Sequence, residues 1–495
     1  MNAAVVQDRA AVPNLKDPKL FRESAYIDGA WVEADSRARF EVDNPADGTV
    51  VGRVPSMGVA ETRRAIAAAE AALPAWRALP AKERSKILRK WHDLIVANAD
   101  DLALILTIEQ GKPLAEAKGE ILYGASFVEW FAEEAKRVYG DVIPSPTNDR
   151  RIVVIKQPIG VVAAITPWNF PNAMITRKVA PGLAVGCTFV IKPAEQTPFS
   201  AFALAELAER AGFPKGVINM VTGDAPPIGQ ELCANPVVRK VTFTGSTEVG
   251  RILMRQSADT IKKLSLELGG NAPFIVFDDA DLDAAAEGAI ASKYRNAGQT
   301  CVCANRIYVQ AGVYDKFAGK LAEKVKQFKV GRGTEQGVNI GPLIDAQGLA
   351  KVEEHVADAV GKGAKVILGG KRSALGGRFY EPTLLTEVTS EMKVSNEETF
   401  GPVAPLYRFE KDEDAVRLAN STEFGLAAYF YARDVGRVWK IAEAIETGMV
   451  GINVGILANE VAPFGGVKQS GLGREGSKYG IDDFLEIKYL AMGGL

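Results

Sequence analysis

Two kinds of sequence pattern alternate between residues 151 and 257, and this alternation constrains the fold more than any other feature. Short Val- and Ile-rich runs are typical of buried strands, whereas the longer Ala-rich runs between them have helical spacing. The predicted strands are residues 151–157, 161–166, 188–192, 217–221 and 240–244, and the predicted helices are residues 172–185, 199–211, 227–234 and 249–257. Strands joined by helices of this length form a parallel sheet wound from βαβ units.

A second series of the same kind begins near residue 266. Its strands are predicted at 273–277, 306–310, 365–368, 427–432 and 449–453, with helices at 282–296, 313–328, 346–361, 413–419 and 435–446. Residues 59–139 have the spacing of amphipathic helices, and residues 483–492 form a strand-like tail. The sequence therefore predicts an α/β protein with two open parallel-sheet domains and an all-helical lead-in. Residues 1–22 are interpreted as a loose N-terminal extension.

The composition excludes several classes of function. Lys and Arg number 59 against 61 Asp and Glu and form no basic stripe, so a nucleic-acid partner is not expected. The longest apolar stretches, such as residues 160–170, are shorter than the roughly 18 residues that a membrane helix needs. Four cysteines make no disulfide framework, which favours a reducing, cytoplasmic setting. The two histidines, His92 and His355, are interpreted as helix-face residues, so a His-dependent triad and a His-rich metal site are not expected.

Two segments at the carboxyl ends of predicted strands have the residues of a nucleotide site. The string FTGSTEVG, residues 243–250, places Gly245 where a phosphate could approach the first N–H groups of a helix. Thr247 replaces the middle glycine of G-x-G-x-x-G, so a plain strand-to-helix turn remains the alternative. Lys192 and Glu195 follow the strand 188–192, where open sheets bind ligands, and a surface ion pair is their alternative interpretation.

Three further segments contain groups suited to covalent catalysis. Glu267 lies in the apolar string LELGGN, where desolvation would raise the pKa of a general base, and a buried ion-paired Glu is the alternative. Cys301 and Cys303 lie in the loop GQTCVCANR, and a loop cysteine is either a nucleophile or a small core residue. Asn169 in TPWNFP is a candidate oxyanion donor, with a helix cap as the alternative.

Taken in order, these motifs resemble those of the NAD(P)-dependent aldehyde dehydrogenase superfamily. The resemblance extends from about Tyr26 to Leu495 and rests on the strings LELGGN, GQTC and EETFGP. Within the superfamily, ITPWNFPNAMITRK, residues 294–306 and GVKQSGLGREGSKYGID are similar to succinate-semialdehyde dehydrogenases.

The resemblance implies catalytic roles for five residues. The Cys301 thiolate would attack the aldehyde carbonyl and form a covalent intermediate. The Asn169 amide and the Cys301 backbone N–H would hold the oxyanion, and hydride transfer to the nicotinamide would leave a thioester. Glu267 would then activate the water that releases the acid. Lys178 and Glu475 match positions that are linked to proton transfer in the family.

The resemblance also implies the cofactor and its site. The cofactor-binding residues would be Thr166, Trp168, Lys192, Glu195, Gly245, Ser246, Glu398 and Phe400. Among them, Lys192 and Glu195 would hold the adenosine ribose, Ser246 a phosphate and Glu398 the nicotinamide ribose. NAD is the first choice of cofactor and NADP the second. The Glu195 carboxylate would repel the 2′-phosphate of NADP, and the positive charge of Lys192 would offset only part of this repulsion.

The family's organisation assigns residues 23–135 and 157–265 to a cofactor-binding domain and residues 266–465 to a catalytic domain. Residues 136–156 and 480–495 would form a small β-flap used for oligomerisation. Homodimers or homotetramers are therefore expected, and the tail strand gains a partner.

Arg177 and Arg295 match carboxylate-binding arginines of the resembling enzymes and are expected to line the tunnel that leads to Cys301. The expected substrate is an ω-carboxy aldehyde, with succinate semialdehyde first and glutarate semialdehyde second. Surface ion pairing is the alternative for both arginines. Ala458 departs from the pattern, because the resembling enzymes usually have a serine there that also holds the carboxylate. A broad-range aldehyde dehydrogenase, an enzyme that acylates coenzyme A and a scaffold relative are the alternative functions.

Cys301 and Cys303 also resemble a regulated C-x-C pair of some succinate-semialdehyde dehydrogenases. In an extended loop their Cα atoms would lie roughly 6–7 Å apart, near the upper limit for a disulfide. A reversible redox switch is therefore one hypothesis, and Cys303 as an apolar filler is the other.

Overall fold

The computed structural model describes residues 13–494. The strands of the first sheet and of the small sheets are β1 (Ala25–Ile27), β2 (Ala30–Val32), β3 (Arg39–Asp43), β4 (Val50–Pro55), β5 (Asp141–Ile143), β6 (Arg150–Pro158), β7 (Val161–Ile165), β8 (Thr188–Lys192), β9 (Ile218–Met220), β10 (Val238–Thr244), β11 (Lys263–Glu267), β19 (Gly471–Leu472) and β20 (Leu485–Gly493). The strands of the second sheet are β12 (Ala272–Val276), β13 (Ala304–Gln310), β14 (Lys365–Leu368), β15 (Thr383–Thr386), β16 (Val403–Phe409), β17 (Ala427–Tyr431) and β18 (Met449–Ile452). The helices are α1 (Val59–Ala78), α2 (Ala81–Ala97), α3 (Ala99–Gln110), α4 (Leu114–Glu134), α5 (Ala173–Val185), α6 (Pro198–Ala211), α7 (Ala225–Ala234), α8 (Thr247–Ser257), α9 (Leu282–Lys293), α10 (Tyr314–Val325), α11 (Ala346–Gly361), α12 (Lys393–Asn396), α13 (Asp412–Asn420) and α14 (Val435–Ala444).

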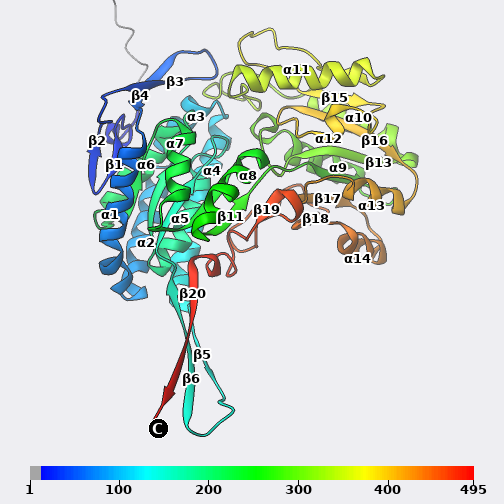
Figure 1. Cartoon of the computed structure of the whole chain (residues 1–495). Coiled ribbons are helices and arrows are strands. Elements are labelled where there is room, and N and C mark those ends of the chain that lie inside the picture. The colour runs from blue at the N-terminus through cyan, green and yellow to red at the C-terminus, as the bar shows by residue number, and fades with distance from the viewer. Residues whose placement is uncertain (1–12, 495) are drawn as a thin grey trace, which may run out of the picture.

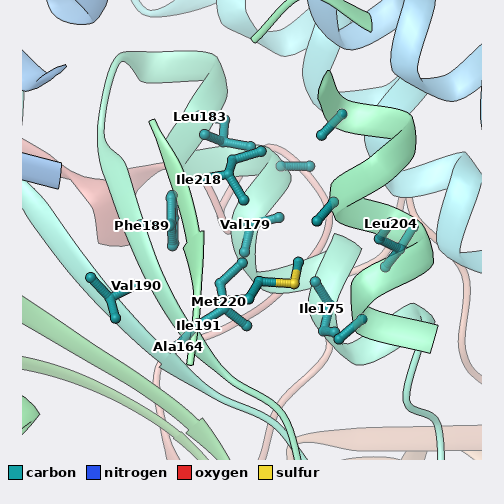
Figure 2. Packing of buried hydrophobic residues seen from close by; sticks show 14 of the residues in the cluster. Ala164, Ile175, Val179, Leu183, Phe189, Val190, Ile191, Leu204, Ile218 and Met220 are labelled. Carbon is teal, nitrogen blue, oxygen red and sulfur yellow. The ribbon is translucent and has the colours of Figure 1, made fainter. Parts of the chain in front are cut away.

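The first sheet has the strand order β19-β11-β10-β7-β8-β9-β1-β2. Its five central strands are parallel, while β1, β2 and β19 at the edges run antiparallel to their neighbours. Figure 2 shows Val179 and Leu183 of α5 beside Phe189 of β8 in the buried core, with Leu204 of α6 nearby. The predicted βαβ series is confirmed here.

The predicted helical segment at residues 59–139 is confirmed as the helices α1 to α4. Helix α1 packs on β8 and β9, α2 on α6, and α4 on α5. All four therefore belong to the layers that cover the first sheet (Figure 1). Their apolar faces are buried against the sheet layer as well as against one another.

The second sheet has the order β14-β15-β16-β13-β12-β17-β18 and is parallel except for β14. Sequence patterns predicted its strands at β12, β13, β14, β17 and β18 but not β15 and β16. A proline inside β16, Pro405, weakens the strand signal there. Two parallel-rich sheets flanked by helices confirm the predicted α/β class.

A small third sheet projects away from the two larger ones (Figure 1). The tail strand β20 pairs antiparallel with β6 from Leu485 opposite Pro158 to Gly493 opposite Arg150, and β5 lies along the other edge of β6. The predicted domain boundary between residues 265 and 266 falls inside β11, which pairs with β10 in the first sheet. The division into domains and the flap's role in assembly stay predictions.

The predicted N-terminal extension lies partly outside the described residues, which begin at residue 13. Its second half is packed and not loose, because Leu15 and Leu20 are buried and the N–H groups of Lys16 and Asp17 donate to the Asp101 carboxylate at 3.0 and 2.8 Å. Within residues 13–494, no helix is long and apolar enough to cross a membrane.

Candidate active site

Close backbone contacts bring together the three motifs that carry the sequence resemblance. Gly298 has φ +78°, and a Cβ atom there would lie 2.1 Å from the carbonyl oxygen of Gly401. A Cβ atom on Gly270 would lie 2.4 Å from the carbonyl oxygen of Cys301. Glycine is required at both positions because any side chain would push the loops apart. The strings GQTC, LELGGN and EETFGP therefore meet around Cys301.

Cys301 lies on the wall of a cavity of about 370 Å³ at the carboxyl edge of the first sheet. Residues of this wall that the sequence predicted are Trp168, Asn169, Gly245, Ser246, Cys301, Glu398 and Phe400. Burial raises the pKa of the Cys301 thiol to about 12, while the charge of Arg177 acts in the opposite direction. The thiol is therefore protonated near neutral pH, and its attack on a carbonyl needs a proton acceptor.

Asn169 follows β7 and lines the same cavity as Cys301. Its side-chain Nδ2 donates to the carbonyl of Gln299 at 3.1 Å, which leaves the second amide hydrogen for another acceptor. Its own carbonyl accepts from Lys112 Nζ at 2.9 Å and from Asn296 Nδ2 at 3.1 Å. The backbone of this candidate oxyanion donor is thus held from two sides.

The cap of α5 is a different residue, Glu120 of α4. Its Oε1 accepts the N–H groups of Asn172 and Ala173 at 3.0 and 3.2 Å, and its Oε2 forms a fully buried ion pair with Lys112. The helix-cap alternative for Asn169 is therefore not supported. Sequence reasoning missed both residues. Nothing in a helical stretch indicates that Glu120 faces another helix, and Lys112 lies in the break between α3 and α4, where no pattern marks a buried cation.

Glu267 ends β11 and is buried. Among residues 13–494 neither of its carboxylate oxygens has a hydrogen-bond partner. Burial raises the pKa of Glu267 well above its usual value, Glu475 reinforces the shift, and the charges of Arg177, Lys178 and Arg474 oppose it. An unpaired carboxyl with a raised pKa fits a proton acceptor better than the alternative of a buried ion-paired Glu.

Arg177 and Lys178 lie on α5, which is buried along its whole length. Both cations pair with the Glu475 carboxylate, through Arg177 Nε and Lys178 Nζ. Burial would raise the pKa of Glu475, but the charges of these two residues hold it below its usual value. Lys178 and Glu475, both matched to proton-transfer positions of the family, are therefore in contact, and their role stays a prediction. The surface ion pair considered for Arg177 is instead an internal one, since its side chain is 1% exposed.

The residues predicted to hold the adenosine ribose lie at the carboxyl end of β8, beside the end of β7. Lys192 Nζ donates to Glu195 Oε1 at 2.6 Å, so the ion pair considered as an alternative does form. Lys192 is buried, whereas Glu195 is half-exposed. The Thr166 N–H donates to the Lys192 carbonyl at 3.1 Å and joins the two strand ends.

The walls of the cavity near α8 and Glu398 contain several groups that could hold a nucleotide. Ser246 caps α8, accepting from the Val249 N–H at 3.3 Å. Burial raises the pKa of Glu398 to about 7, and its Oε1 accepts from the Gly270 N–H at 3.3 Å. The rings of Trp168 and Phe400 meet edge to face with centroids 5.5 Å apart.

Helix α11 contributes cavity residues that sequence reasoning missed, including Gln347 and Lys351. On the same helix, His355 is buried and not a plain helix-face residue. Its ring nitrogens lie 3.1 Å from Thr399 Oγ1 and 3.2 Å from Glu397 Oε2, on either side of Glu398 in sequence. His355 therefore helps to hold the EETFGP loop.

The loop around Cys303 is a turn and not the predicted extended segment, because the Cys303 N–H donates to the Thr300 carbonyl at 3.0 Å. The Cys303 thiol is buried and donates to the Lys293 carbonyl at 3.0 Å. Both Cys301 and Cys303 are free thiols in the described chain. The redox pair stays a prediction, and the packed thiol is consistent with the apolar-filler alternative.

Whereas Cys301 and Asn169 line the first cavity, a second cavity, of about 450 Å³, contains Arg295. Its wall includes Glu116, Tyr123, Tyr294, Arg295, Asn339 and Ala458. The Arg295 guanidinium carbon lies 4.8 Å from the centre of the Phe170 ring, one residue after Asn169. A positively charged side chain thus lines a cavity close to the segment that carries Asn169, the candidate oxyanion donor.

The sequence profile of the aldehyde dehydrogenase family matches residues 31–490. The chain belongs to this family. It is 68% identical over 481 residues to a glutarate-semialdehyde dehydrogenase of Pseudomonas aeruginosa, covering 97% of this chain and 100% of the relative. It is 65% identical over 479 residues to succinate-semialdehyde dehydrogenase (NADP(+)) of Escherichia coli, covering 97% and 99%.

Among solved structures, succinate-semialdehyde dehydrogenase from Burkholderia pseudomallei superposes with a TM-score of 0.97 at 67% identity, covering 97% of this chain and 100% of that one. The predicted aldehyde dehydrogenase fold, the family and the assignment as an NAD(P)-dependent enzyme are confirmed by these likenesses. The roles of individual residues stay predictions.

Proposed function

We propose that this aldehyde dehydrogenase oxidises an ω-carboxy aldehyde to the acid, with succinate semialdehyde first and glutarate semialdehyde second. The observation that carries the proposal is the position of Arg295, which lines a cavity of about 450 Å³ and lies 4.8 Å from the ring centre of Phe170, the neighbour of Asn169. A guanidinium can bind a carboxylate with two parallel hydrogen bonds. The names of the Pseudomonas and Escherichia relatives support the same class of substrate.

In the proposed reaction, the Cys301 sulfur bonds to the aldehyde carbon, and the Asn169 amide and the Cys301 N–H stabilise the oxyanion. Bound NAD(P)+ supplies the hydride acceptor, and a thioester on Cys301 remains. Glu267 then takes a proton from the water that cleaves the thioester. Glu475 and Lys178, which form an ion pair, would pass that proton on. The unpaired Glu267 favours water over coenzyme A as the acceptor.

The residues of the cavity at Cys301 fit the nicotinamide half of the cofactor. Glu398 offers a carboxylate to ribose hydroxyls, and the N-terminus of α8 at Gly245 and Ser246 offers backbone N–H groups to a phosphate. Lys192 and Glu195, at the end of the neighbouring strand β8, would hold the adenosine ribose.

We further infer that the strands β5, β6 and β20 join copies of this chain into a homodimer or homotetramer. Apolar side chains on them face outward, with Val142 78%, Ile487 72% and Tyr489 57% exposed. Exposed apolar groups on a three-stranded ribbon are typical of an association surface.

Replacing Arg295 tests the substrate class. A hydrogen bond to a charged group contributes about 1.5–3 kcal/mol, so Arg295→Ala should lower kcat/KM for succinate semialdehyde roughly ten- to hundredfold. The loss on butanal, which has no carboxylate, should be much smaller. Steady-state kinetics on both aldehydes measure this difference. Equal losses on both substrates, or a wild-type enzyme that prefers butanal, would contradict the proposal.

Replacing Glu195 tests the choice of cofactor. The carboxylate accepts hydrogen bonds from ribose hydroxyls and repels a 2′-phosphate, so we expect a higher kcat/KM with NAD than with NADP. Glu195→Ser should narrow the gap, because it removes the repulsion and leaves Lys192 free of its partner. The E. coli relative is named as an NADP(+) enzyme, so kcat/KM values of this chain with NAD and with NADP show whether the two proteins differ in their cofactor. A wild-type preference for NADP would overturn the expectation.

A further inference from the structure

Arg177, the arginine predicted to reach the substrate from α5, lines neither cavity, and its buried Nη2 has no hydrogen-bond partner among the described residues. Arg177 pairs through Nε with Glu475, and its guanidinium carbon lies 4.1 Å from the centre of the Phe464 ring. Its Nη1 donates to the hydroxyl of Tyr123 at 3.5 Å. Tyr123 lies on α4 and lines the cavity that contains Arg295, so it connects Arg177 to that cavity.

The direction of this hydrogen bond determines what Tyr123 can do. A guanidinium only donates, so the Tyr123 oxygen accepts from Arg177 and keeps its own O–H to donate. A phenol that accepts from a cation is also a stronger donor, because hydrogen bonds in a chain polarise one another. Burial raises the pKa of Tyr123, while the charges of Arg177 and Arg295 oppose the rise. The hydroxyl therefore stays protonated and can donate near neutral pH.

Ala458 leaves one position of the cavity wall without a hydrogen-bond donor. It lines the same cavity as Tyr123 and Arg295 but has no hydrogen-bonding side chain. The neighbouring Glu116 does not compensate, since its Oε2 accepts from the Asn296 N–H at 2.8 Å and it is itself an acid. Burial raises the pKa of Glu116, while the Asn296 N–H and the charges of Lys112 and Arg295 oppose the rise.

We propose that the Tyr123 hydroxyl, held by Arg177, is a specificity-determining donor to the distal carboxylate of the substrate, opposite Arg295 in the same cavity. This inference rests on the proposed ω-carboxy aldehyde substrate. It assigns Arg177 an indirect role, in which the guanidinium orients and polarises Tyr123 and does not itself clamp the substrate.

The test is Tyr123→Phe, which removes one oxygen and keeps the ring whose centroid lies 4.9 Å from that of Phe127. We expect kcat/KM for succinate semialdehyde to fall by about ten- to a hundredfold, mainly through KM, because a hydrogen bond to a charged group is lost. The fall on butanal should be much smaller, so the ratio of the two kcat/KM values should change by nearly the same factor.

Tyr294→Phe is the matched control. Tyr294 lines the same cavity, but its hydroxyl donates to the Thr383 carbonyl at 2.9 Å, so it is not available to a ligand. The control should leave the substrate ratio unchanged, and thermal melting should show that both variants fold. A wild-type enzyme that prefers butanal would overturn the proposed function. If the wild type prefers succinate semialdehyde, two results would overturn only the role of Tyr123. One is a Tyr123→Phe variant that keeps this preference, and the other is a Tyr294→Phe variant that loses it to the same extent.

Discussion

Cys301→Ala should abolish turnover, lowering kcat by roughly a thousandfold or more, because the thioester route requires the sulfur nucleophile. Cys301 has the geometry for this role, since it lines one cavity with Asn169 and lies in backbone contact with Gly270. The measurement is steady-state formation of reduced cofactor with succinate semialdehyde. A single-turnover experiment should likewise show no reduced cofactor, which places the defect before the hydride step.

Cys233→Ala is the control for Cys301→Ala. Cys233 is a buried free thiol on α7 and does not line the cavity at Cys301 within the part of the chain that the structure describes. Its loss should leave kcat/KM near the wild-type value, although removing a buried side chain lowers stability. Near-normal activity of Cys301→Ala would show that another group forms the covalent bond, or that none does.

The raised pKa of Cys301 makes a proton acceptor part of the mechanism. Near neutral pH the thiol is neutral, so its proton must leave as the sulfur attacks. Burial and Glu475 also make the Glu267 carboxylate more basic than one of ordinary pKa. The Glu267→Gln experiment below therefore decides whether this carboxylate serves only the hydrolysis step or also takes the thiol proton.

The elements that position the site could be predicted where the sequence has a clear period. Strand β8 has the predicted bounds, and β7 and α5 differ from theirs by one residue at one end. A fully buried parallel strand is a continuous apolar run, which gives a strong signal. The short edge strands β1 and β2 were missed because strands of three residues contain too few positions to show a period.

The candidate catalytic groups could be named from motifs, but the residues that hold them could not. Lys112 and Asn296 donate to the Asn169 carbonyl from segments far from it in sequence. Lys112 lies just before α4 and Asn296 just after α9, so these contacts depend on how distant segments pack, which no local pattern encodes. The same limit applies to Arg177. Its place in the sequence suggested a contact with the substrate, but in the structure its Nε pairs with Glu475, nearly 300 residues later.

Glu267→Gln should separate formation of the thioester from its hydrolysis. The amide is close in size to the carboxyl, so the cavity keeps its shape, but it cannot take a proton from water. Steady-state kcat should fall by about a hundred- to ten-thousandfold, the usual contribution of a general base. If acylation remains faster than hydrolysis, mixing enzyme, cofactor and aldehyde should give a burst of reduced cofactor close to one equivalent, followed by slow turnover.

The pH dependence gives the Glu267→Gln experiment a second readout. The pKa of Glu267 is raised in the folded protein, so the folded state binds more protons than the unfolded state between the two pKa values. Stability from this group is therefore present at low pH and is lost as pH rises through that interval. Glu267→Gln removes the ionisation, so above the unfolded pKa the variant should melt at a temperature equal to or higher than that of the wild type.

Wild-type hydrolysis of the thioester should rise with pH as Glu267 loses its proton, and the Gln variant should lack that rise. A surface change, Glu413→Gln on α13, should keep both the activity and the pH profile. A Glu267→Gln enzyme that hydrolyses the thioester at the wild-type rate would remove Glu267 from the role of base. A variant that shows no burst because acylation has slowed would instead place the essential proton transfer at the attack by Cys301. That step also needs a proton acceptor, because the pKa of the Cys301 thiol is raised.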